Sequence, residues 1–176
     1  MKKSLGVPPQ LFTASVVALA SCLHFGEFVG VHEAMSQCHL KYGRLEGRRP
    51  LNGALARFAR AYSPVFSAPG AWKASPKGEL RQLLMQAMAE SIAFSAKCKE
   101  GHGMDFARVL LEEEATQNGV RPALFDNPVY AKLSNIKVKV SSLPPVEGIS
   151  FGTKPPSGGY NVGFAVHATS INVVIM

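Results

Sequence analysis

The last fifty residues decide the fold of this chain: NPVYAKLSNIKVKVSSLPP at 127–145, ISFGTKPPSGGYNVGF at 149–164 and INVVI at 171–175. Proline and glycine separate these short apolar runs, which is typical of strands joined by turns. Apolar side chains alternate at Ile136, Val138 and Val140, so one face of the first strand is predicted to point into a core. Ser141 and Ser142 then close this strand just before two prolines, which places two hydroxyl groups at a strand end.

Upstream of these strands the sequence predicts mainly helices. They are expected at about 9–25, 52–62, 75–101 and 105–118, with a short extended stretch at 27–33. The 75–101 helix is predicted from apolar residues at four-residue spacing, namely Leu80, Leu84, Met88 and Ile92. Residues 43–50 read as an irregular basic segment, and 63–74 as a loop. The chain is therefore expected to be helical over 9–118 and strand-rich over 134–176, an α/β or α+β pattern.

Length and composition fit one globular domain. The 176 residues are 47% hydrophobic and 18% charged, which is enough for a sizeable core. Nineteen Lys and Arg against twelve Asp and Glu give a formal charge of +7, which favours an anionic partner. Because the basic residues are scattered and lack interleaved aromatics, zinc spacing or a helix-turn-helix pattern, we expect no nucleic acid. A phosphate-bearing cofactor such as coenzyme A fits the charge equally well.

Three cysteines, Cys22, Cys38 and Cys98, lie far apart in the sequence. Their odd number and wide spacing favour a reducing compartment over a disulfide framework or a metal cluster. We therefore expect an intracellular protein with no metal site and no transmembrane span.

The N-terminus offers an alternative. Two lysines precede an apolar stretch at 11–23, and LASC at 19–22 is similar to the cleavage site of a bacterial lipoprotein. Pro8 and Pro9 come just before this stretch and suit the first turn of a folded helix. The folded-helix interpretation is preferred, with an exported lipoprotein as the competing one.

The ordered motifs of the last fifty residues resemble the C-terminal end of the carnitine/choline acyltransferase family. NPVY at 127–130 stands where the family has an aspartate-proline-serine-tyrosine-like run, and VSSLPP at 140–145 where it has Ser-Thr-Ser-Gln-Val-Pro. FG at 151–152 and GGYNV at 158–162 follow in the places of Phe-Phe-Gly-Pro and Asp-Gly-Tyr-Gly-Val. Order and spacing agree, apart from one extra residue near Gly159.

The resemblance continues upstream in the same order. Family members carry Ser-Pro-Asp-Ala-Phe, Tyr-Glu-Ser-Ala-Ser, Gly-Arg-Thr-Glu followed by an arginine, and Asp-Arg-His at a helix. This chain has PPQLF at 8–12, HEAMS at 32–36, GRLE at 43–46 with Arg49, and DFA at 105–107. The resemblance therefore covers nearly the whole chain at the level of motifs.

This resemblance implies a fold and a co-substrate. The expected fold is an α/β, CoA-dependent acyltransferase-like half-domain of the chloramphenicol acetyltransferase-like type, with helices packed on a mixed β-sheet formed mainly by the C-terminal strands. Family members are longer and have two similarly folded halves, and all the matches lie in the second. Residues 1–176 are thus expected to be a C-terminal half, a fragment or split gene product whose N-terminal half is a missing partner. Acyl-CoA is the implied co-substrate, without a metal, and the implied location is mitochondrial, peroxisomal or cytosolic.

The family mechanism assigns roles to the serines at the strand end. A histidine of the preceding half takes the proton of the acceptor hydroxyl, which attacks the thioester of acyl-CoA, and a serine of Ser-Thr-Ser holds the oxyanion. Ser142 matches that serine and Ser141 the threonine, so both are the predicted catalytic residues, while Val140 replaces the first serine. From the residues alone, a plain strand end is the preferred explanation of the two hydroxyls. None of the five histidines lies in the family's His-x-x-x-Asp context, so the isolated chain is expected to be inactive.

Coenzyme A contacts follow from the same register. Lys3 lies where the family places a lysine on the 3′-phosphate, and Glu33 where a glutamate lines the pantetheine channel. A lysine this close to the terminus is also commonly just solvated. Arg44 and Arg49 match arginines near the substrate cleft, or else they belong to a solvent-facing basic loop.

The acceptor residues depart from the family. Its carnitine enzymes bind the carboxylate with a tyrosine, a threonine and an arginine, and His32, Leu45 and Phe106 stand in their places. Because a lost charge-assisted hydrogen bond costs about 1.5 to 3 kcal/mol, carnitine is expected to bind about a hundredfold worse. His32 fits either an acceptor ligand or a polar core residue. We expect an acyltransferase with a diverged small hydroxyl acceptor, and a non-catalytic acyl-CoA-binding or regulatory paralogue is the alternative.

Overall fold

The computed structural model describes residues 6–66, 75–144 and 154–176. Its helices are α2 (Pro9–Phe25), α3 (Gly53–Tyr62), α4 (Lys77–Lys99), α5 (Asp105–Gln117) and α6 (Pro128–Ser134), with a 3₁₀ turn at Pro64–Phe66. Its strands are β1 (Gly30–Ser36), β2 (Leu45–Arg48), β3 (Ile136–Leu143), β4 (Tyr160–Val166) and β5 (Ile171–Ile175). Lys3 and the Phe151-Gly152 motif lie outside the described residues.

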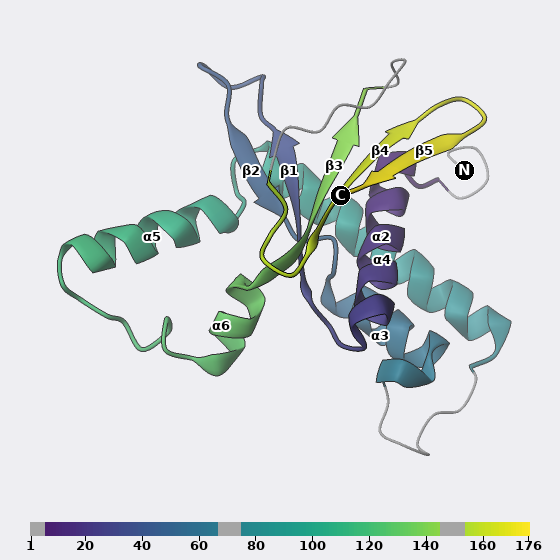
Figure 1. The fold of residues 1–176 in the computed structure, drawn as a ribbon. Helices are drawn as coiled ribbons and strands as arrows, with labels where there is room; N and C mark the ends of the chain where they lie inside the picture. The colour runs from purple at the N-terminus through teal and green to yellow at the C-terminus, as the bar shows by residue number, and fades with distance from the viewer. Residues whose placement is uncertain (1–5, 67–74, 145–153) are drawn as a thin grey trace.

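A mixed five-stranded sheet in the order β2-β1-β3-β4-β5 forms the centre of the molecule (Figure 1). β3 pairs in parallel with both β1 and β4, whereas β2 and β5 are antiparallel edge strands. The α/β half-domain expected from the sequence is confirmed, and three of the five strands come from the C-terminal part. The 9–118 segment is mainly helical, and it also supplies β1, which overlaps the extended stretch expected at 27–33, and β2, which was not expected.

The hydrophobic core lies between one face of the sheet and helices α2, α3 and α4. The sheet contributes Val31, Val138, Val140, Val162 and Phe164, and the helices contribute Ala14, Ala18, Cys22, Leu55, Ala87 and Met88. Small side chains on α2 let that helix approach the sheet closely, since a bulky residue there would hold it away. The predicted alternation of β3 is confirmed for Val138 and Val140, each 1% exposed.

The buried face of helix α4 differs in its second half from the face predicted by the sequence pattern. Met88 is buried as expected, but Ile92 is 37% exposed. A strict four-residue spacing drifts around a helix of 3.6 residues per turn, so the inward line passes from Met88 to Ser91, Ser95 and Cys98 instead. Small side chains therefore occupy the second half of the buried face of α4, where Ser91 accepts a hydrogen bond from Asn52 at the start of α3.

Two elements were missed by the sequence patterns. Segment 43–50, expected to be irregular, contains β2, a short strand whose glycine and alternating charges hide its periodicity. Residues 128–134, expected to continue the strand-like run, form α6. Asn127 caps α6 by accepting a hydrogen bond from the amide of Val129, with Pro128 at the first helical position, and this capping pattern was readable in the sequence.

The N-terminal apolar stretch forms α2 over the residues predicted, Pro9–Phe25. Cys22, the cysteine of the lipoprotein-like motif, is fully buried in the core on this helix. Within residues 6–66, 75–144 and 154–176, none of the helices combines the length and hydropathy needed to cross a membrane.

Candidate functional site

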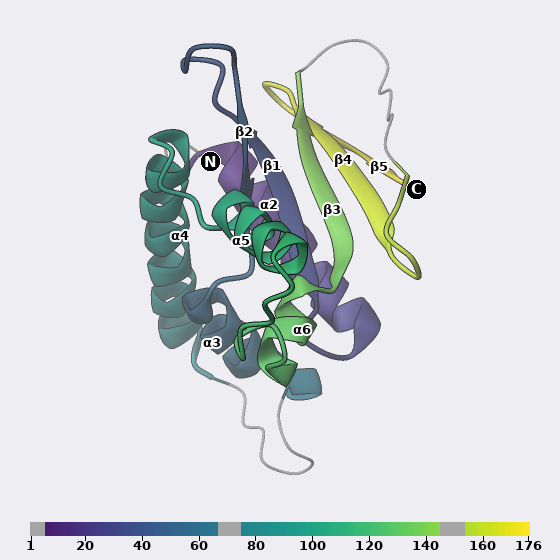
Figure 2. The same ribbon diagram turned by 90° about the vertical axis from the view of Figure 1, so that its left-hand side faces the viewer.

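The candidate site lies on the face of the sheet opposite the core, where β1 and β2 meet the start of α5 (Figure 2). Alternation along β1 turns His32 to this face, because its neighbour Val31 points into the core. Gly47 of β2 permits the close approach of α5. A Cβ atom at Gly47 would lie 2.6 Å from Oδ2 of Asp105 and 2.7 Å from Nε2 of His32. A side chain at position 47 would therefore push the first turn of α5 away from the sheet.

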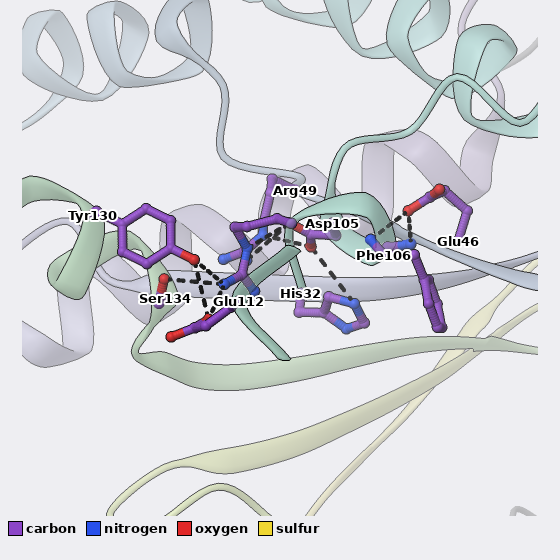
Figure 3. Close-up of polar contacts among 10 residues, drawn as sticks. His32, Glu46, Arg49, Asp105, Phe106, Glu112, Tyr130 and Ser134 are labelled. Carbon is purple, nitrogen blue, oxygen red and sulfur yellow. Dashed lines mark hydrogen bonds and ion pairs between the residues drawn. The ribbon is translucent and has the colours of Figure 1, made fainter. Parts of the chain in front are cut away.

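Asp105 is the centre of the site, in the first turn of α5. Arg49 donates from Nε to Oδ2 at 2.8 Å and from Nη2 to Oδ1 at 3.0 Å, which is a two-point contact between guanidinium and carboxylate. His32 lies on the other side, with Nε2 at 3.8 Å from Oδ2 (Figure 3). This last distance is too long for a hydrogen bond, so Asp105 influences His32 through charge.

His32 is more neutral than a histidine in water. Burial lowers the pKa of its imidazole, and the charges of Arg49 and Lys139 act in the same direction, while Asp105 and Glu46 oppose them. Burial dominates, so the pKa is below its ordinary value. A neutral imidazole has one N–H donor and one nitrogen acceptor, which suits hydrogen bonding to a hydroxyl group.

A second polar network ties α5 to α6. Arg108 Nη1 donates to the hydroxyl of Tyr130 at 2.9 Å and to Oγ of Ser134 at 3.3 Å. It also lies 3.4 Å from Oε2 of Glu112, to which Tyr130 donates at 3.1 Å (Figure 3). These contacts fix the orientation of α5. They also pair the charge of Arg108 with groups of the protein itself.

The other two predicted acceptor residues line a pocket of about 560 Å³ at the start of α5. Leu45 of β2 and Phe106 of α5 form part of its wall, together with Arg44. Glu46 anchors this region, since its Oε1 accepts from the amides of Gly47 at 2.7 Å and of Phe106 at 3.4 Å. Because Asp105 immediately precedes Phe106, the structure brings His32, Leu45 and Phe106 to the same helix start.

Glu33, predicted to contact coenzyme A, is 5% exposed on the core side of β1. Arg48, which is fully buried, donates from Nε to its Oε2 at 2.7 Å and from Nη2 to the same oxygen. Burial raises the pKa of Glu33, and the guanidinium of Arg48 partly offsets this effect. The sequence reasoning missed Arg48 as the partner, although antiparallel pairing of β1 with β2 places the two residues opposite one another.

The predicted catalytic serines lie at the C-terminal end of β3, beside Gly163 and Phe164 of β4. Ser142 is exposed and Ser141 half-buried. Alternation along β3 places Ser141 on the same face as Lys139, which is the pairing partner of His32. Ser141 therefore shares the face of His32, about 7 Å further along the strand direction, whereas Ser142 belongs to the opposite face.

The model of the choline/carnitine O-acyltransferase family matches residues 1–176, the whole chain. No curated protein matches the sequence significantly. The mixed sheet with its helices is consistent with a half-domain of such an enzyme. Acyltransfer with acyl-CoA as co-substrate is the activity that this family implies, and the chain belongs to the choline/carnitine O-acyltransferase family.

Proposed function

We propose that this chain is the C-terminal half of a CoA-dependent acyltransferase whose acceptor is a small hydroxyl compound without a carboxylate. Family membership supports acyl-CoA and an acceptor as the substrates. The observation that carries the acceptor proposal is the convergence of His32, Leu45 and Phe106 at the start of α5. These positions lie far apart in the sequence, and the register taken from the motifs assigns all three to the acceptor.

The charges around His32 favour a neutral acceptor group. Arg49 is held in a two-point contact by Asp105, and Arg108 contacts Tyr130, Ser134 and Glu112. A carboxylate brought next to His32 would face the negative charge of Asp105, which disfavours it, while Lys139, opposite His32 on β3, is a neighbouring cation that acts in the other sense. A hydroxyl group can instead hydrogen-bond to the neutral imidazole, and this does not require a charged group to be buried.

The chemistry divides between this chain and its missing half. The acceptor oxygen attacks the thioester carbonyl, the carbon–sulfur bond breaks, and the proton removed from the hydroxyl passes to the departing thiolate through a base of the other half. In this chain, Ser142, at the position of the family's oxyanion serine, is proposed to donate a hydrogen bond to the oxyanion that forms during attack. Ser141, at the threonine position and on the opposite face of β3, is proposed as the second catalytic hydroxyl, on the side of His32. Lys3 and Glu33 are proposed to contact coenzyme A. Contact through Glu33 requires its carboxylate to serve Arg48 and the cofactor together.

A metal-free intracellular enzyme, in mitochondria, peroxisomes or cytosol, is part of the same proposal. Support comes from the family and from the cysteines, which are all free thiols, with Cys22 and Cys98 buried. Fractionation of cells expressing the tagged chain tests the compartment directly. Recovery in a secreted or outer-membrane fraction contradicts it.

Acceptor binding to the purified chain tests the proposal. Choline and carnitine are titrated into isotope-labelled protein, and amide shifts are followed around His32, Leu45 and Phe106. Choline is expected to shift these resonances, and carnitine to bind at least tenfold more weakly. Arg44→Ala is the control, because Arg44 lines the same pocket and is the residue there able to receive a carboxylate. Carnitine binding that equals choline binding and disappears in Arg44→Ala contradicts the proposed acceptor class.

Turnover of the isolated chain separates this proposal from simpler ones. With acyl-CoA and acceptor, the chain alone is expected to release no thiol above background, because the general base belongs to the missing half. Thiol release that His32→Ala abolishes would show that the chain carries its own base. If the chain binds acyl-CoA but remains inactive after joining to a competent first half, the non-catalytic paralogue is the correct reading.

A further inference from the structure

Strand β5 lies at one edge of the sheet, and in the described part of the chain its outer backbone groups face no neighbouring strand. β5 is the last strand in the sheet order, and its pairing with β4 runs without a bulge from Ile171 opposite Val166 to Ile175 opposite Val162. Among the residues that the structure describes, no further strand follows it at this edge. An edge strand with free backbone N–H and C=O groups is a template for strand addition.

The hydrogen bonds between β4 and β5 show which backbone groups of β5 face outward. Met176 and Asn161 exchange two bonds, at 2.9 and 3.0 Å, and His167 donates to Ser170 at 2.9 Å. Hydrogen-bonded pairs alternate along an antiparallel ladder, so Asn172 and Val174 also direct their backbone groups toward β4. The N–H and C=O groups of Ile171, Val173 and Ile175 consequently point away from the sheet.

These three residues also present their side chains at the edge. Ile171 is 38% exposed, Val173 49% and Ile175 65%. Val173 and Ile175 line an apolar groove of about 440 Å³ between β5 and α2, together with Val16. The strand INVVI has no charge and no proline, which are two of the devices by which natural edges avoid pairing.

We propose that β5 is a self-association edge, at which a second copy of this chain adds its own β5 antiparallel with a two-fold axis at Val173. This register places Val173 opposite its own copy and Ile171 opposite Ile175. All three outward-facing residues then meet their counterparts in hydrogen-bonded pairs, which closes the edge of both sheets at once.

A second copy fits this edge better than a charged partner. The strand pattern Ile-x-Val-x-Ile is its own complement under the two-fold axis, so apolar side chains meet apolar side chains on the groove side. Each copy carries a formal charge of +7, but β5 itself is uncharged, and like charges are not brought opposite one another on this strand. The sheet continues through the axis, with both α2 helices on the same face. The association is independent of whether the chain transfers acyl groups.

Disulfide trapping tests the register. In a Cys38→Ser background, which removes the exposed thiol, Val173→Cys is oxidised in dilute solution. A hydrogen-bonded antiparallel pair has a Cα separation of about 5.5 Å, which a disulfide spans. Val173→Cys is expected to form a covalent dimer. Ile171→Cys alone is expected to fail, since its copy lies four residues away, about 13 Å along the strand, whereas Ile171→Cys with Ile175→Cys is expected to succeed. Equal trapping by Val173→Cys and Ile171→Cys overturns the proposed register.

Sedimentation of unmodified protein tests the association itself. The chain is expected to show a concentration-dependent dimer, and Val173→Pro to weaken it by about tenfold or more, because two interchain bonds lose their donors. Val174→Pro is the folding control, since it removes a donor to β4 and is expected to lower the melting temperature where Val173→Pro does not. Thr169→Lys, in the exposed turn before β5, is expected to leave the dimer intact. A monomer at all concentrations, or a dimer unchanged in a folded Val173→Pro, overturns the proposal.

Discussion

The two faces of the sheet are held by different interactions. On one face, α2, α3 and α4 bury a continuous apolar layer that includes Phe164 and Leu55, both fully buried. On the other face, α5 has no buried residue and is fastened at its first turn through Asp105. The first face supplies the hydrophobic stability of the domain, and the second supplies polar side chains positioned by charge. The face with the weaker apolar support carries the candidate site, as expected for elements that contact substrates.

The largest expected difference between the faces comes from one substitution made on each. Phe164→Ala leaves a cavity in the core and is expected to reduce the free energy of unfolding by about 3–5 kcal/mol. Phe106→Ala at the start of α5 is expected to cost about 1 kcal/mol or less, because Phe106 is 49% exposed. Urea unfolding of both variants measures the contrast. Similar losses would mean that α5 shares in the core after all.

The carboxylate of Asp105 gives the next effect in size. Asp105→Ala removes both hydrogen bonds from Arg49 and is expected to cost about 1–3 kcal/mol, mostly as local opening of α5. Amide hydrogen exchange should quicken in α5 while Val138 and Val140 keep their protection. Glu113→Ala, an exposed acid on the same helix, is the matched control. Uniform acceleration across the whole sheet argues against a locally fastened helix.

The pH dependence from His32 is the smallest effect. Burial lowers its folded pKa below the ordinary 6.5, so between these two values the unfolded chain binds more protons than the folded one. Stability is therefore expected to fall as the pH drops below about 6.5. The charges of Asp105, Glu46, Arg49 and Lys139 face this imidazole, and their balance leaves burial as the main cause.

Thermal unfolding between pH 5.5 and 7.5 measures this contribution. His32→Gln should flatten the pH dependence in this window, whereas His39→Gln, in an exposed turn, should leave it as in the parent protein. A His32→Gln variant with the parent's slope would show that the imidazole is solvated in the folded state.

Much of the fold was readable because local signals agreed with the tertiary structure. The prolines before α2, the alternation at Val138 and Val140, and Gly119 after α5 predicted their elements correctly. β2 was missed because four residues with two inward-facing charges show no apolar period. Their burial is explained only by contacts in the folded chain, since Arg48 donates to Glu33 of the neighbouring strand and Glu46 accepts from the amides of Gly47 and Phe106.

The candidate site was less predictable, because its contacts join residues distant in sequence. Family motifs pointed to His32, Leu45 and Phe106, but the two-point contact of Arg49 with Asp105 follows from the close packing of α5 on Gly47. Tyr130 belonged to a recognised motif, yet its contact with Arg108 depends on where α6 folds back. The faces of Ser141 and Ser142 follow from strand alternation and show that the two hydroxyls point in different directions.

Leu45 and Phe106 are proposed to decide which acceptor binds, because they stand where carnitine enzymes of the family bind a carboxylate. The most direct test joins the chain to a competent first half and measures the ratio of kcat/KM for choline over carnitine, before and after Leu45→Thr with Phe106→Arg. Arginine offers a planar carboxylate two hydrogen bonds, while phenylalanine offers only apolar surface. The parent is expected to prefer choline, and the double variant to move the ratio toward carnitine by about tenfold or more, whereas a folding defect lowers both efficiencies alike. An unchanged ratio would contradict the claim and place the acceptor away from Leu45 and Phe106.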